Sequence, residues 1–93
     1  MPTWERTGRF DRDWARLAAD DRARFRSAIG HLIEDVGSGS FRTALRVKRV
    51  QGTDDVFEMN WSPDGRATFE YGTDDGAHVI WRRIGRHDIL RRP

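Results

Sequence analysis

A helical stripe of apolar residues between positions 25 and 36 is the clearest periodic pattern in the chain. The apolar residues recur at spacings of three and four, which places them on one side of a helix. They are Phe25, Ala28, Ile29, Leu32, Ile33 and Val36. Asp20 and Asp21 precede the stripe as candidate N-caps, and Gly37 follows it as a residue that ends helices.

A shorter apolar pattern precedes this helix. Phe10, Trp14 and Leu17 stand at i, i+4 and i+7, which predicts a first, short helix. The two helices together predict a helical hairpin over residues 10–36 with one polar side. Residues 3–9 alternate weakly and predict a short strand anchored by Trp4. We expect Trp4 and Trp14 to be core residues.

The rest of the chain alternates with the period of a strand. Apolar and polar residues alternate over 45–48, 57–61 and 66–71, and residues 78–84 are rich in Val, Ile and Trp. Ser62-Pro63-Asp64-Gly65 predicts a hairpin turn in which Gly65 takes the left-handed position. A second turn is expected over residues 72–76.

These elements predict an α+β fold of order β-α-α-β-β-β in one domain, residues 1–93. Two N-terminal helices would pack on one face of a small, mainly antiparallel four-stranded sheet. The helical stripe would cover Phe57, Met59, Trp61, Phe69 and Tyr71. The opposite face would carry Arg46, Lys48, Glu58, Asn60, Arg66, Thr68 and Glu70.

The composition narrows the class of protein. A length of 93 residues fits a single small domain, and 34% charged residues indicate a highly charged surface. The absence of cysteine excludes disulfides and thiolate metal sites. No apolar run approaches the length of a membrane helix and no signal peptide is evident, so we expect a cytoplasmic protein without membrane contact.

Arginine dominates the basic residues. The net charge is only +2, from 17 Lys and Arg against 15 Asp and Glu, and Lys48 is the single lysine. Arginine offers a planar fork of donors that suits phosphate or carboxylate. The basic clusters over 46–49 and 82–92 therefore indicate either an anionic partner or a coding bias with solvated side chains.

Three segments together resemble the RelE/ParE toxin superfamily. Residues 45–50 resemble its basic strand after the two helices, residues 56–69 resemble its central hairpin with an arginine early in the next strand, and Gly85-Arg86-His87-Asp88-Ile89 resembles its Gly-x-His-Asp-Ile ending. The resemblance implies the toxin of a type II toxin–antitoxin system and a cognate antitoxin as partner. RelE- and HigB-like members cleave mRNA within the ribosome, whereas ParE-like members inhibit DNA gyrase.

Metal-independent RNA cleavage needs an acid, a base and cations around the phosphate. His87 is the candidate acid or base, unless it is an exposed loop histidine or a helix cap. Arg66 and Lys48 would hold the phosphate; alternatively Arg66 is a cross-strand partner of Glu58 and Lys48 protects a sheet edge. Glu58 would be a general base or a structural partner of Arg66 or Arg46.

Five arginines are candidates for RNA binding: Arg46, Arg49, Arg82, Arg83 and Arg86. Neighbouring strand residues point to opposite faces, so at most one of Arg82 and Arg83 belongs to the site. His31 is expected to be structural, and we expect no metal and no cofactor. One residue departs from the family: nucleases of this kind often carry a tyrosine where this chain has Leu90.

The sequence therefore leaves three functions open. The first is a ribosome-dependent mRNA endonuclease that inhibits translation, with mRNA and the ribosome as partners. The second is a gyrase inhibitor without nuclease activity. The third is a catalytically degenerate protein that only binds an antitoxin.

Overall fold

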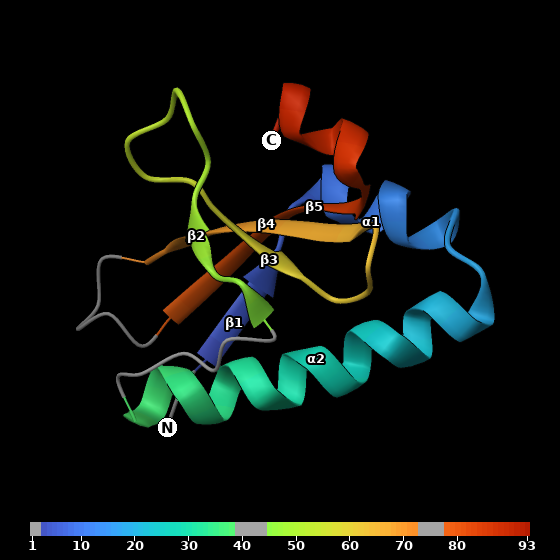
Figure 1. Ribbon diagram of the computed structural model, residues 1–93, viewed down its shortest axis with the longest axis horizontal. Helices are drawn as coiled ribbons and strands as arrows, with labels where there is room; N and C mark the ends of the chain where they lie inside the picture. The colour runs from blue at the N-terminus through green and yellow to red at the C-terminus, as the bar shows by residue number, and fades with distance from the viewer. Residues whose placement is uncertain (1–2, 39–44, 73–77) are drawn as a thin grey trace.

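A computed structural model describes residues 3–38, 45–72 and 78–93 (Figure 1). The turn expected over 72–76 lies, apart from Gly72, outside the described residues. In chain order the elements are β1 (Thr3–Arg6), α1 (Gly8–Ala15), α2 (Ala19–Ser38), β2 (Lys48–Arg49), β3 (Phe57–Asn60), β4 (Gly65–Tyr71), β5 (His78–Arg86) and the 3₁₀ helix η2 (His87–Arg91). The predicted α+β class is confirmed. Within the described residues, no helix is long and apolar enough to cross a membrane.

The sheet has five strands in the order β1-β5-β4-β3-β2, so the predicted count of four is wrong. β1 pairs with β5 in parallel and every other pair is antiparallel, as expected of a mainly antiparallel sheet. Strand-like segments were expected near all five strands, and the order β-α-α-β-β-β left one of them out. Both edge strands are short, four residues in β1 and two in β2.

The first helix begins at Thr7, whose hydroxyl has two partners. It accepts a hydrogen bond from the Phe10 N–H at 3.2 Å, which caps α1. It also donates to the Arg82 carbonyl at 2.9 Å, and the Thr7 N–H donates to the Trp81 carbonyl at 3.0 Å. The start of α1 is thereby joined to β5.

The second helix carries the predicted stripe, with Phe25, Ala28 and Leu32 buried. Its ends differ from the prediction. Asp20 and Asp21 lie inside the first turn rather than capping it, where their charges favour the helix dipole. The helix also continues through Gly37 to Ser38 because one glycine costs a helix only about 1 kcal/mol.

An aromatic cluster fills the core between the helices and the sheet. Trp81, which is 1% exposed, has ring centroids of Phe25, Phe69 and Phe10 at 5.2, 5.4 and 6.1 Å. Such pairs add to the stabilisation from burial. The expectation that Trp4 is a core residue is wrong: Trp4 lies on the edge strand β1, is 47% exposed and contacts the Arg6 guanidinium.

The predicted hairpin between β3 and β4 is confirmed, but Gly65 has a different role. Among the described glycines only Gly52 has a positive φ, so Gly65 does not take a left-handed conformation. A Cβ on Gly65 would lie 2.5 Å from the Trp61 ring. Glycine is needed here because the indole packs directly on the backbone.

Candidate functional site

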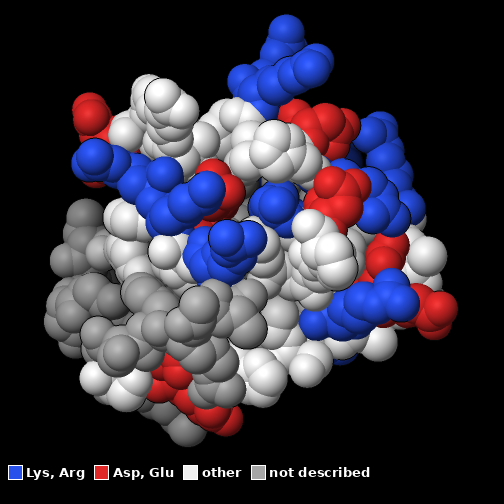
Figure 2. Space-filling view, in the orientation of Figure 1, with Lys and Arg blue, Asp and Glu red and all other residues white. Residues whose placement is uncertain are grey.

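A hollow of about 990 Å³ opens on the sheet face that carries β2 and η2. Figure 2 views this face and shows basic side chains gathered around its centre, with acidic side chains among them. The hollow brings together all four predicted catalytic residues and two of the five predicted RNA-binding arginines. Its predicted residues are Arg46, Lys48, Arg49, Glu58, Arg66 and His87.

Strand register explains why residues far apart in sequence meet here. Lys48 on β2 is opposite Glu58 on β3, and Glu58 is opposite Thr68 on β4. In the neighbouring row, Asn60 is opposite Arg66. Residues paired directly across antiparallel strands have Cβ atoms about 5 Å apart on the same face. The alternation seen in the sequence thus places a cation, a carboxylate and a second cation side by side.

The guanidinium of Arg66 is held by backbone carbonyls rather than by a carboxylate. Its Nη1 donates to the carbonyls of Gly65 at 2.9 Å and Pro63 at 3.3 Å. Glu58 is 5% exposed, and in the described part of the chain no ion pair joins it to Arg46 or Arg66. The positive charge of Arg66 is therefore not neutralised by a neighbouring acid in the described residues and can attract an anion.

Arg46 has a backbone conformation that is unusual for its type. Its φ is 48°, in the left-handed region that costs an L-residue about 1 kcal/mol or more. Such strain persists only where the surrounding fold imposes it, and it is frequent at functional sites. The conformation lies directly before Val47 and β2, and the exposed Arg46 side chain is part of the wall of the hollow.

His87 begins η2 at the point where β5 ends. The 3₁₀ helix packs against β4 and β5, and Ile89 is buried beneath it. Gly85 permits this packing because a Cβ there would lie 2.8 Å from the Ile89 Cγ2 atom. The exposed His87 and the half-buried Leu90 consequently line the same hollow as Arg66.

The remaining predicted RNA-binding arginines lie outside the lining of the hollow. Arg82 forms an ion pair with Glu70 at 2.9 Å and its Nε donates to the Pro93 carbonyl at 3.2 Å. Arg86 lies 3.6 Å from both Asp21 and Asp64, at the start of α2 and in the β3–β4 turn.

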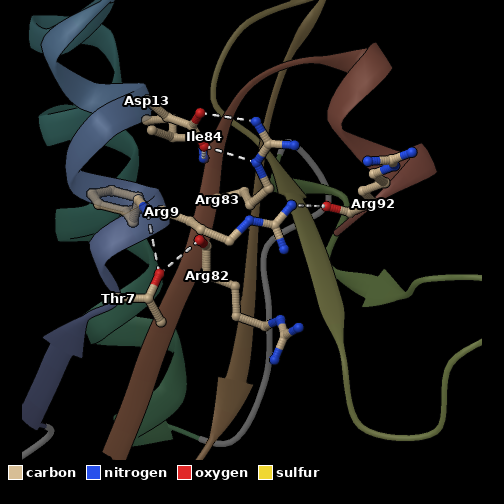
Figure 3. Close-up of polar contacts among 8 residues, drawn as sticks. Thr7, Arg9, Asp13, Arg82, Arg83, Ile84 and Arg92 are labelled. Atoms are coloured by element: carbon tan, nitrogen blue, oxygen red, sulfur yellow. Dashed lines mark hydrogen bonds and ion pairs between the residues drawn. The ribbon is translucent and has the colours of Figure 1, made fainter.

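Arg83 forms a bidentate, largely buried ion pair with Asp13 on α1 (Figure 3). Its Nε and Nη2 atoms donate to the two carboxylate oxygens at 2.9 Å each, and the Ile84 N–H donates at 3.2 Å. Burial alone would raise the pKa of the Asp13 carboxyl, but these hydrogen bonds and the charges of Arg83 and Arg16 outweigh it and hold the pKa below its usual value.

The partner's pKa moves in the complementary direction. The hydrogen bond to Asp13 raises the pKa of Arg83, against the opposing effect of burial, and the charges of Asp13 and Asp88 add to the rise. Arg83 therefore holds α1 on β5. The sequence cannot reveal this because the two partners are 70 residues apart.

The hollow contains the groups that acid–base chemistry on a phosphodiester requires: an imidazole, a carboxylate, and cations on two sides. Within the described ranges no group of three His, Asp or Glu side chains could hold a metal ion. Sequence reasoning had placed Asn60 on this face without assigning it a role. It lines the hollow between Glu58 and the turn, and the alternation that identified Glu58 applies equally to it.

The fold is shared with known toxins. A metal-bound toxin from Helicobacter pylori is 20% identical, with a TM-score of 0.74 over 97% of this chain and 99% of that chain. A chain of the Escherichia coli DinJ–YafQ toxin–antitoxin complex is 16% identical, with a TM-score of 0.72 over 96% of both chains. One from the RelB–RelE antitoxin–toxin complex of Methanococcus jannaschii is 17% identical, with a TM-score of 0.65 over 92% and 93%.

No protein-family model matches the sequence, and the comparison with curated proteins finds no match. The chain therefore has the RelE-like toxin fold, established by its structure at low sequence identity.

Proposed function

We propose that this protein, whose fold is that of RelE- and YafQ-type toxins, is the toxin of a type II toxin–antitoxin system and cleaves mRNA in the ribosome. The observation that carries the proposal is the hollow in which His87, Glu58, Arg66 and Lys48 meet. A fold shared with toxins does not by itself specify an activity, so the chemistry must come from these side chains.

The proposed reaction is an attack of the ribose 2′-oxygen on the neighbouring phosphorus. The Glu58 carboxylate accepts the 2′-OH proton, the P–O5′ bond breaks, and the His87 imidazolium gives its proton to the leaving 5′-oxygen. The products are a 2′,3′-cyclic phosphate and a 5′-hydroxyl. Arg66 and Lys48 stabilise the extra negative charge on the phosphoryl oxygens in the transition state.

The basic rim of the hollow is proposed to bind the RNA backbone. Arg46 and Arg49 are exposed beside Lys48 and can contact phosphates on either side of the scissile bond. Such contacts release counterions, so RNA affinity should fall steeply as salt concentration rises.

An antitoxin is the proposed protein partner, in the cytoplasm. Two of the three structural neighbours described above come from toxin–antitoxin complexes, RelB–RelE and DinJ–YafQ. A partner that offers carboxylates to the cationic hollow would block RNA by direct competition, because the same cations would bind both.

The test is the substitution His87→Ala. Loss of a general acid lowers the rate of a phosphoryl reaction by about 10²–10⁴-fold, so RNA cleavage with ribosomes and growth arrest should both disappear. Arg91→Ala is the matched control, since Arg91 is exposed on the same 3₁₀ helix and does not line the hollow. A folded His87→Ala protein that cleaves as fast as the wild type would rule out this role for His87.

Leu90 favours two alternatives to the nuclease: an inhibitor of DNA gyrase without nuclease activity, and a degenerate protein that only binds an antitoxin. Its side chain stands in the hollow where related nucleases often have a tyrosine. Tyr71 cannot replace it, because its ring packs against Phe57 and Phe69 at 5.2 and 5.5 Å. Inhibition of gyrase supercoiling without RNA cleavage would favour the gyrase inhibitor, and a lack of both activities the degenerate protein.

A further inference from the structure

The hollow beside His87 is larger than a single phosphate requires. Its volume of about 990 Å³ lies at the upper end of the range for sites that hold a whole small molecule. An RNA strand with its scissile phosphate beside Glu58 would therefore bring a base within reach of the walls. The arginines and Lys48 cannot distinguish bases through the backbone, because the phosphate is the same in every nucleotide. Recognition of a base must come from other side chains of the lining.

Two carboxamide side chains line the hollow, and each offers a donor and an acceptor. Asn60 is half-buried and lies opposite Arg66, close to the proposed reaction. Gln51 is exposed on the loop that joins β2 to β3, and none of the described hydrogen bonds engages its carboxamide. In Figure 1 this loop and η2 both extend toward the top of the view, and residues of both line the hollow. Gln51 is thus available to a base that lies beyond the reacting groups.

The loop holds Gln51 in a defined turn. The Thr53 N–H donates to the Val50 carbonyl at 3.1 Å, which closes a four-residue turn. Gly52, the third residue, has a φ of 86°, the left-handed value that a type II turn requires there. The Thr53 hydroxyl donates to the Val50 carbonyl at 2.7 Å, and the Val50 N–H donates to the Val56 carbonyl at 2.8 Å. The backbone under Gln51 is therefore set before a ligand arrives, which lowers the entropy cost of binding.

The spacing from the proposed reaction site suits one nucleotide. Gln51 follows Lys48 by three residues, about 10 Å along an extended chain. Lys48 is opposite Glu58, so the scissile phosphate would lie beside both. A ribose and its base together bridge a distance of this size, so the base next to that phosphate can present its edge to Gln51. Single-stranded RNA is read in this way, through hydrogen bonds to the edges of its bases.

We infer that Gln51 is a specificity-determining residue that reads the edge of the base next to the scissile phosphate. The inference rests on the proposed RNA cleavage and deepens it. The carboxamide oxygen accepts from an amino or imino group of the base, and the carboxamide NH₂ donates to the ring nitrogen or carbonyl beside it. Paired contacts of this kind let glutamine select a base in nucleic-acid complexes. The arginines and Lys48 supply affinity without selection.

The test removes the carboxamide and compares bases one at a time. Gln51→Met keeps the length of the side chain but has neither its donor nor its acceptor. Asp54→Asn is the matched control, since Asp54 is exposed in the same loop and does not line the hollow. The probes are short RNA oligonucleotides with one 2′-deoxy sugar, which cannot be cut at that sugar, and they differ only in the base on one side of it. An abasic oligonucleotide with the same phosphates is the control ligand.

For the wild type and Asp54→Asn, the tightest and weakest of these oligonucleotides should differ in Kd by about fivefold or more at constant salt, because a paired base contact discriminates by at least that factor. Gln51→Met should bind them all with nearly the same Kd. NMR follows the side-chain NH₂ signals of Gln51, assigned from their loss in Gln51→Met. The preferred oligonucleotide should shift these signals and the abasic one should leave them unmoved. The sequence profile of RNA cleavage on ribosomes should flatten in Gln51→Met as well.

The outcomes separate this inference from the proposed function. If RNA is never cut, but Gln51→Met removes the differences in Kd, the nuclease proposal fails and base reading by Gln51 stands. If RNA is cut and Gln51→Met keeps the cleavage profile of the wild type, the inference is wrong and the nuclease stands. If no oligonucleotide binds, a flattened cleavage profile supports the inference, whereas an unchanged profile or a lack of cleavage overturns it.

Discussion

The ion pair between Asp13 and Arg83 offers a quantitative test of what holds α1 on the sheet. Asp13→Ala removes a carboxylate that is 8% exposed and accepts three hydrogen bonds, two from Arg83 and one from the Ile84 N–H. The guanidinium and the N–H would then lack a partner. Breaking a buried pair from one side costs about 3–5 kcal/mol, and the 21% exposure of the Arg83 side chain places the loss near the lower value, about 3 kcal/mol.

A loss of about 3 kcal/mol is large for this chain. Domains are stable by about 0.05–0.15 kcal/mol per residue, so 93 residues correspond to roughly 5–14 kcal/mol. The thermal midpoint should fall by about 12–24 °C, since 1 kcal/mol corresponds to about 4–8 °C at this size. Urea unfolding followed by circular dichroism measures the free energy directly.

Asp11→Ala is the matched control on the same helix. Asp11 pairs with Arg6 at 3.2 Å, but both side chains are about half exposed, so the change should stay below about 1 kcal/mol. The reasoning is refuted if Asp13→Ala is no more destabilising than Asp11→Ala. Arg83→Met tests whether Arg83 is a structural residue or an RNA contact. If Arg83 is structural, the substitution lowers the free energy of unfolding. If Arg83 contacts RNA instead, the substitution weakens RNA binding and leaves the free energy of unfolding unchanged.

The remaining predictions concern pH and two backbone positions. Folding lowers the pKa of the Asp13 carboxyl from 3.8. The carboxylate therefore contributes its full stabilisation at pH values above the pKa of the unfolded state, and this stabilisation is lost as the pH falls through the pKa of the folded state. In urea unfolding at a series of pH values, Asp13→Asn should remove this part of the decrease in stability at acid pH. Arg46→Gly should keep or raise the thermal midpoint while slowing RNA cleavage, whereas Arg46→Val should lower the midpoint, because only glycine adopts a φ of 48° freely. Gly65→Ala should cost about 1–3 kcal/mol in urea unfolding, since its Cβ would overlap the Trp61 ring, while Gly30→Ala in α2 meets nothing within 4 Å and should stabilise by up to about 1 kcal/mol. Equal effects of the two alanines would contradict the packing described at the turn.

Periodicity predicted the parts of the fold that burial dictates. Phe25, Ala28 and Leu32 are spaced by three and four residues, so they lie on the same side of a helix that has 3.6 residues per turn. That side packs on the sheet, and all three side chains are buried. In the same way, the two-residue period put Glu58 and Arg66 on one face, and strand register then brought both to one hollow. These features depend on local spacing, which a sequence displays directly.

Features that depend on distant partners or on sheet edges were beyond the sequence. Trp4 looked like a core residue because alternation does not say that its strand is an edge. Arg83 looked like an RNA contact because its carboxylate partner lies on α1, and because the register shift between Thr68 and Phe69 disturbs the simple alternation of faces around it.

The parallel pairing of β1 with β5 has a consequence for synthesis. Thr3 is in register with His78, so the first strand has no partner until most of the chain has been made. Contacts between such distant segments form late, since long loops must close first, and ribosomes add only about 5–20 residues per second. A nascent chain in which residues 78–87 have not yet been added therefore lacks both the completed sheet and the wall that carries His87. On the proposed function, the toxin would be inactive toward RNA until β5 and His87 have been added and have packed.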